Sequence, residues 1–124
     1  MLQYFAEWRI VGEAADGVEG IRKTEELQPD IILLDIGLPR LNGIDAAKPI
    51  LSVAPHSKIV FVSVELCPEF VQGALRTGAH GYVVKCDAAS DLLTAMSTVL
   101  HGQRFVGRRF ANCDFILPND LNRA

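Results

Sequence analysis

Three polar residues of this chain have the types that phosphoryl transfer requires, and each directly follows a short apolar run: Asp35, Ser63 and Lys85. A carboxylate can act as a nucleophile and take up a phosphoryl group as an acyl phosphate. A hydroxyl can donate to one phosphoryl oxygen, and an ammonium group can neutralise charge on another. Any strand that leaves the core must meet water at a polar residue, and this explains each of the three residues equally well when it is taken alone. Found together and in this order, they favour a shared site.

The apolar runs before these residues predict the strands that would position them. Residues 31–34 are continuously apolar and partly β-branched, as is typical of a strand buried on both faces of a parallel sheet, and residues 58–62 and 80–84 predict two further buried strands. Longer segments with helical spacing alternate with them, which indicates an α/β, doubly wound fold. In such a sheet the carboxyl ends of the strands open onto one crevice. The fold would therefore bring the three polar residues together.

The same patterns predict the remaining elements. Residues 9–14 are expected to form a further strand that ends at the turn signal Asp16-Gly17. Pro49 lies inside an expected helix and should kink it or delay its start. The helices are expected at residues 18–27, 44–53, 68 to about 77 and 88–101.

Composition excludes several classes of protein. The cysteines Cys67, Cys86 and Cys113 lie far apart without a CxxC pair, which argues against a zinc site or a disulfide framework. A net charge of −3 gives no field for nonspecific nucleic-acid binding, and the late arginines 104, 108 and 109 are most simply solvated. No apolar run reaches the ~18 residues of a membrane span, and a signal-peptide profile is absent. We expect a cytoplasmic protein without direct nucleic-acid or membrane binding.

Several motifs resemble the receiver domains of two-component response regulators, and the flanking segments look most like the LuxR-type subgroup. The motifs are LDIGLP at 34–39, Asn42-Gly43, Val62-Ser63 and GAHGYVVK at 78–85, flanked by 11–14 and 87–93. The resemblance spans residues 8 to about 106. It implies a flavodoxin-like sheet and a role in phosphorelay signalling, as a phospho-acceptor rather than an enzyme.

The resemblance also implies a role for individual positions. Asp35 matches the aspartate that accepts phosphate from a histidine kinase, and the backbone carbonyl of Gly37 matches a ligand of Mg²⁺. Ser63 matches the hydroxyl switch residue, and Lys85 the lysine that pairs with the phosphoryl group. Tyr82 matches the aromatic residue whose burial follows phosphorylation. By composition alone, Tyr82 is more simply a half-buried strand tyrosine.

The chain departs from the receiver pattern at its start. Receivers begin with a strand that ends in an acidic pair, which holds Mg²⁺, and continue into a first helix. Residues 1–8 look like the last turns of that helix, so the strand, the pair and most of the helix are expected to be missing. Mg²⁺ favours near-octahedral oxygen coordination and usually more than one carboxylate. A pseudo-receiver, which acts as an interaction or dimerisation module without phosphorylation, is therefore the alternative.

The expected gap leads to a hypothesis about the C-terminal tail. We expect a truncated receiver over residues 1–106 and a tail over 107–124. The run Phe115-Ile-Leu117 could replace the missing strand between 9–14 and 31–35, which would bring Asn119 and Asp120 near Asp35. The alternatives are a frayed tail, with the 9–14 strand paired directly, or pairing with a partner chain.

Two further expectations concern partners. The last predicted helix carries an apolar stripe on the side that the missing helix would cover, and large apolar patches rarely stay exposed. We therefore expect a homo-oligomer that buries this side. A small doubly wound enzyme or nucleotide binder has little support, because no GxGxxG or Walker-type loop follows any predicted strand.

Overall fold

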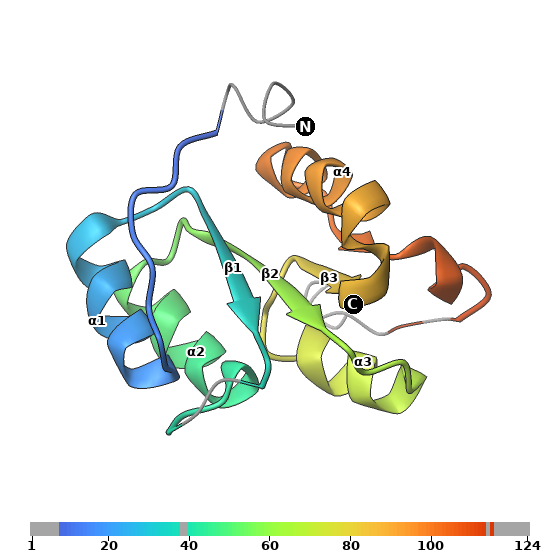
Figure 1. Cartoon of the computed structure of the whole chain (residues 1–124), viewed down its shortest axis with the longest axis horizontal. Helices are drawn as coiled ribbons and strands as arrows, with labels where there is room; N and C mark the ends of the chain where they lie inside the picture. Colours follow the sequence, from blue (N-terminus) through green and yellow to red (C-terminus); the bar gives the residue numbers. More distant parts are fainter. Residues whose placement is uncertain (1–7, 38–39, 114, 116–124) are drawn as a thin grey trace, which may run out of the picture.

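The computed structural model describes residues 8–37, 40–113 and 115, in which helices and strands alternate (Figure 1). The elements are α1 (Gly17–Leu27), β1 (Ile31–Asp35), α2 (Gly43–Val53), β2 (Lys58–Ser63), α3 (Pro68–Leu75), β3 (Gly81–Val84), α4 (Ala88–Leu100) and β4 (Phe105–Val106). Short 3₁₀ turns lie at Lys85–Asp87 and Arg108–Phe110. None of the described helices is long and apolar enough to cross a membrane.

The strands of the described residues form one parallel sheet in the order β1-β2-β3-β4. Asp35 at the end of β1 pairs with Val62, and Ser63 on β2 pairs with Val84, the residue before Lys85. The register therefore brings the carboxyl ends of three strands to one edge of the sheet. Together with helices on both faces, this confirms the predicted doubly wound, flavodoxin-like fold.

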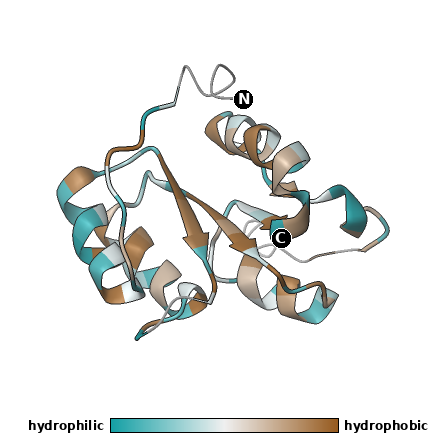
Figure 2. Ribbon diagram, viewed as in Figure 1, coloured by the Kyte–Doolittle hydropathy of each residue, from teal (hydrophilic) through white to brown (hydrophobic). Residues whose placement is uncertain are grey.

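Alternate residues of each strand pack into two separate cores. Leu34, Phe61 and Tyr82 belong to the larger core, which α2 and α3 cover and against which α1 packs through Ile21. Val60 and Val83 point to the opposite face and are buried under α4. Both cores pack against strands that Figure 2 shows mostly in the brown of hydrophobic residues.

The helix starts follow from local capping chemistry. Asp16 and Asn42 are the N-caps of α1 and α2, and their side chains accept the backbone N–H groups of Glu19 and Asp45 at 2.9 Å. The expected delay by Pro49 is wrong, because α2 begins at Gly43 and continues through it. Pro49 has no N–H to donate to the carbonyl of Asp45, four residues earlier in the helix. Both residues are exposed, so water can hydrate this carbonyl instead.

The expected strand at residues 9–14 is not a strand in the structure. Ile10 is 83% exposed, and Glu13 accepts a hydrogen bond from Lys23 of α1 through its backbone carbonyl. Gly12 lies against the side chain of Leu27, also on α1. A strand needs a neighbouring backbone, and no described strand lies beside this segment, because β1 pairs only with β2.

The proposed replacement strand is not supported at Phe115, its one described residue. Phe115 lies outside the strands and contacts Phe110 edge-on, with ring centroids 6.2 Å apart. Phe110 contacts Tyr82 of β3 in the same way at 6.1 Å. Phe115 therefore packs on the β3 side of the sheet, away from the free edge of β1. The rest of the run, including Asn119 and Asp120, lies outside the described residues.

Candidate functional site

The structure brings Asp35 and Lys85 into direct contact. Lys85 Nζ donates to Asp35 Oδ2 at 2.7 Å, and the other carboxylate oxygen accepts the backbone N–H of Gly37 at 2.8 Å. Asp35 ends β1 and Lys85 directly follows β3, so the pair spans β2 along the carboxyl edge of the sheet. The side chains are 41% and 45% exposed, which leaves the site open to a ligand from solution.

The surroundings of Asp35 favour its ionised form. Partial burial raises the pKa of its carboxyl, but hydrogen bonds from Lys85 and Gly37 and the charge of Lys85 outweigh this and hold the pKa below 3.8. At neutral pH, Asp35 is therefore a carboxylate with one oxygen on a cation and one on a backbone donor. This is the form that can act as a nucleophile.

The loop after Asp35 depends on a close backbone approach at Gly43. A Cβ atom there would come within 2.7 Å of the carbonyl oxygen of Asp35, and the N–H of Gly43 donates to the carbonyl of Ile36 at 3.1 Å. Glycine therefore lets the start of α2 pack directly behind the end of β1. The Asn42-Gly43 motif carries the sequence signal for this contact.

Ser63 is placed beside Tyr82 rather than on the Asp35–Lys85 pair. Its hydroxyl is buried and accepts the N–H of Glu65 at 3.1 Å, and the Tyr82 hydroxyl donates to the carbonyl of Glu65 at 3.0 Å. The expectation of a half-buried Tyr82 is wrong, since its side chain is fully buried against Phe110. Burial raises the pKa of the phenol, and a hydrogen bond with Ser63 opposes that rise. The backbone of Glu65 thus links the two residues, and no sequence pattern singles it out.

Two of the three arginines that were expected to be solvated, Arg104 and Arg109, make contacts within the protein, whereas Arg108 is exposed. Arg109 binds the Asp87 carboxylate through Nε at 2.6 Å and Nη2 at 2.8 Å, and Nη2 lies 3.3 Å from the Cys86 sulfur. This pairing lowers the pKa of Asp87. Arg104 donates to the carbonyl of Ala79 at 2.6 Å. Arg109 therefore ties the turn that carries Lys85 to the segment after β4, a contact between positions that are distant in sequence.

The described residues do not complete a magnesium site. They contain no group of three or more His, Cys, Asp or Glu side chains that could hold a metal ion. The expected ligands, Asp35 and the carbonyl of Gly37, supply one carboxylate and one neutral oxygen, whereas Mg²⁺ needs near-octahedral oxygen coordination. The donor set within the described residues is too small for this ion.

Comparisons with known proteins agree with the fold and the strand-end motifs. The family model for the response regulator receiver domain matches residues 1–97. The chain is 37% identical over 94 residues to the chemotaxis protein CheY of Thermotoga maritima, covering 76% of this chain and 78% of CheY. It is 37% identical over 94 residues to YxjL, an uncharacterized transcriptional regulatory protein of Bacillus subtilis, covering 76% of this chain and 43% of YxjL. The chain spans about half the length of YxjL and of the response regulator GacA of Pseudomonas viridiflava, which it also matches.

Solved structures give the same result. A LuxR-family two-component response regulator from Aurantimonas sp. SI85-9A1 is 32% identical, with a TM-score of 0.78 over 83% of this chain and 74% of that one. The response regulator domain of Thermotoga maritima CheB is also 32% identical, with a TM-score of 0.68 over 75% and 77% of the two chains. The sheet, the strand-end residues and these matches together show that the chain belongs to the response-regulator receiver domain family.

Proposed function

We propose that this chain accepts a phosphoryl group on Asp35 from the phosphorylated histidine of a kinase. The observation that carries the proposal is the ionised Asp35 carboxylate, held at the carboxyl end of β1 with Lys85 Nζ at 2.7 Å. Membership of the receiver family supports phosphoryl acceptance, and the histidine kinase is the donor that the family resemblance implies. In this account the chain is a phospho-acceptor and not a classical enzyme.

The proposed step conserves atoms and charge. A carboxylate oxygen of Asp35 attacks the phosphorus of the phosphohistidine, an oxygen–phosphorus bond forms and the nitrogen–phosphorus bond breaks. The imidazole nitrogen of the donor leaves with the electron pair. Lys85, already within hydrogen-bond distance of Asp35, is placed to neutralise charge on a phosphoryl oxygen.

We propose Ser63 and Tyr82 as the residues that report phosphorylation. Both bind the backbone of Glu65, Ser63 at its N–H and Tyr82 at its carbonyl. A Ser63 hydroxyl that turns to donate to a phosphoryl oxygen would give up the N–H of Glu65. The loop that holds the Tyr82 hydroxyl would then be free to move, which couples the acceptor site to the side chain of Tyr82.

The test is labelling by a small phosphodonor. The chain is incubated with phosphoramidate, with and without Mg²⁺, and its intact mass is measured. We expect a gain of one phosphoryl group that is stable in acid and lost in hydroxylamine. The near-isosteric D35N variant should show no gain, and K85M a slower one. D30N alters an exposed aspartate just before β1 and is the matched control, which should label like the native chain.

A second candidate function is a phosphorylation-independent interaction module, and the incomplete set of magnesium ligands favours it. This pseudo-receiver would keep the fold and the Asp35–Lys85 ion pair but would take up no label from phosphoramidate under any metal condition. An unlabelled, folded native chain would therefore select this candidate over the first. Under both candidates we propose that the chain associates with a second copy.

A further inference from the structure

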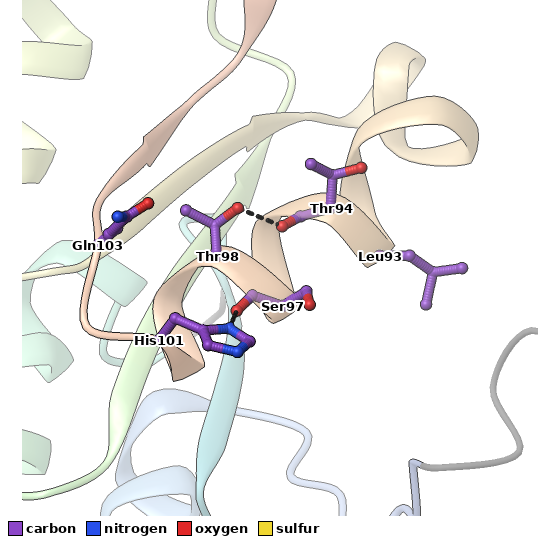
Figure 3. Close-up of a pocket in the computed structure, with 6 residues that line it drawn as sticks. All are labelled: Leu93, Thr94, Ser97, Thr98, His101 and Gln103. Atoms are coloured by element: carbon purple, nitrogen blue, oxygen red, sulfur yellow. Dashed lines mark hydrogen bonds between the residues drawn. The ribbon is translucent and has the colours of Figure 1, made fainter.

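The chain that follows α4 runs along the edge of β3. Gly102 has a φ of 83°, a left-handed conformation that glycine adopts without strain, and the N–H of Gln103 donates to the carbonyl of Thr98 at 3.2 Å. Figure 3 shows Gln103 on the segment that leaves the end of α4. The end of the helix therefore sets the direction of residues 104–113, which we call the cap segment.

The backbone of the cap segment is joined to β3 by a short strand. β4 is two residues long and pairs Phe105 with Gly81 and Val106 with Tyr82. The N–H of Phe105 also donates to the carbonyl of His80 at 3.0 Å. Most strands are longer than this, and a region with little backbone pairing opens at a lower free energy than the core strands. β4 can therefore separate from β3 while the rest of the sheet stays folded.

The cap segment also supplies a ring that covers Tyr82. Phe110 is 5% exposed and meets Tyr82 edge-on, with ring centroids 6.1 Å apart, and Phe115 meets Phe110 at 6.2 Å. Tyr82 is fully buried, and its hydroxyl donates to the carbonyl of Glu65 at 3.0 Å. The burial of Tyr82 thus depends on a side chain that lies beyond the last strand.

An ion pair fastens the same part of the cap segment. Arg109 binds the carboxylate of Asp87 through Nε at 2.6 Å and Nη2 at 2.8 Å, and such two-point contacts fix the geometry of both side chains. The two side chains are 37% and 26% exposed, so water can compete for the pair. Asp87 belongs to the turn that begins with Lys85, so this attachment lies beside the candidate site.

We propose that the cap segment is an autoinhibitory contact that keeps Tyr82 buried, and that the Arg109–Asp87 ion pair sets how often the segment and Tyr82 open together. Phe110 directly follows Arg109 within one 3₁₀ turn. When Arg109 leaves Asp87, this turn loses its side-chain anchor, and the ring of Phe110 can move off Tyr82. The opening exposes Tyr82 and the edge of β3, which gives the C-terminal part of the chain its own control over Tyr82. The contact acts in the unphosphorylated chain, so the proposal does not depend on phosphoryl acceptance at Asp35.

The experiment measures the exposure of Tyr82 and of the cap segment in the unphosphorylated full chain. N-acetylimidazole acetylates accessible tyrosine hydroxyls, and peptide mass spectrometry gives the rate at Tyr82. Hydrogen exchange gives the opening of residues 104–113. We expect R109Q to raise both rates by the same factor, about threefold, and F110A to raise the rate at Tyr82 about tenfold or more. R108Q is the matched control, because it removes the same charge from an exposed neighbour in the same turn, and it should change neither rate.

Hydrogen exchange of β2 in R109Q separates local opening from unfolding of the whole chain. The proposal expects no change there, and a rise in β2 equal to that in the cap segment would overturn it. Unchanged rates in R109Q, an equal response of R108Q, or a cap segment that opens more often while Tyr82 stays unreactive would each contradict it. If F110A does not fold by circular dichroism, F110L replaces it with the same expected direction.

Discussion

The two faces of the sheet differ although the same strands build both. On the α1–α3 face, Phe61 and Tyr82 are fully buried within one continuous core. On the α4 face, Val60 is equally buried, but Leu33, one strand away, is 45% exposed. Hydropathy does not separate these positions, since all lie in apolar runs. The covering helix decides which apolar side chains are buried: Ile31 of β1 still packs against the core under α4, and Leu33 of the same strand is left partly exposed.

The largest expected effect comes from truncating one residue on each face. F61A removes a fully buried ring from the larger core and should lower the free energy of unfolding by about 3–5 kcal/mol. L33A removes a side chain that is nearly half exposed, so its effect should stay below about 1 kcal/mol in the monomer. Urea denaturation at low protein concentration measures both values. Equal losses would show that the two faces are covered alike.

The next effect is a pH dependence at the amino end of β3. His80 Nδ1 accepts the backbone N–H of Ile59, a residue of the larger core, at 3.3 Å. Burial, followed by the charges of Lys58 and Arg104, lowers the pKa of His80 from 6.5 to about 4. Because the folded pKa lies below the unfolded one, the contribution is complete above about pH 6.5 and is lost as the pH falls towards 4.

A tenfold change in proton affinity corresponds to about 1.4 kcal/mol, so a pKa lowered from 6.5 to about 4 sets an upper limit of about 3.5 kcal/mol on the loss of stability at His80. His80 is partly exposed, so solvent screening makes the loss smaller than this limit. The measurement compares the free energy of unfolding of the native chain and of H80Q between pH 7 and 5. The native chain should lose stability over this range, and H80Q, which cannot take up the proton, should lose much less. Parallel curves would contradict the placement of His80.

The smallest expected effect is at the candidate site. Asp35 has a lowered pKa, so the ion pair with Lys85 contributes above about pH 3.8 and is lost as the pH falls through the folded pKa. Both side chains are substantially exposed, so the contribution to stability should be at most about 1 kcal/mol. NMR titration of the Asp35 carboxyl should give a higher pKa in K85M than in the native chain. An unchanged pKa would show that Lys85 does not pair with Asp35.

The strands and the residues at their ends could be predicted from the sequence pattern. The contacts that depend on a particular partner elsewhere in the chain could not. Asp35 and Lys85 meet because both directly follow apolar strands of one parallel sheet, which the sequence pattern predicts. The segment before the Asp16-Gly17 turn signal predicts a strand at residues 9–14, but no described strand offers it a backbone partner. The contact of Arg109 with Asp87 joins positions 22 residues apart, and Tyr82 is buried by Phe110 from the segment after β4. Neither contact leaves a periodic signal in the sequence.

The most direct test of the central claim is to identify the residue that carries the phosphoryl group. After incubation with phosphoramidate, borohydride reduction converts an aspartyl phosphate to homoserine, which peptide mass spectrometry locates in the chain. We expect homoserine at Asp35 and at no other aspartate. Homoserine at another position, or its absence from a chain shown to be folded, would contradict Asp35 as the phospho-acceptor.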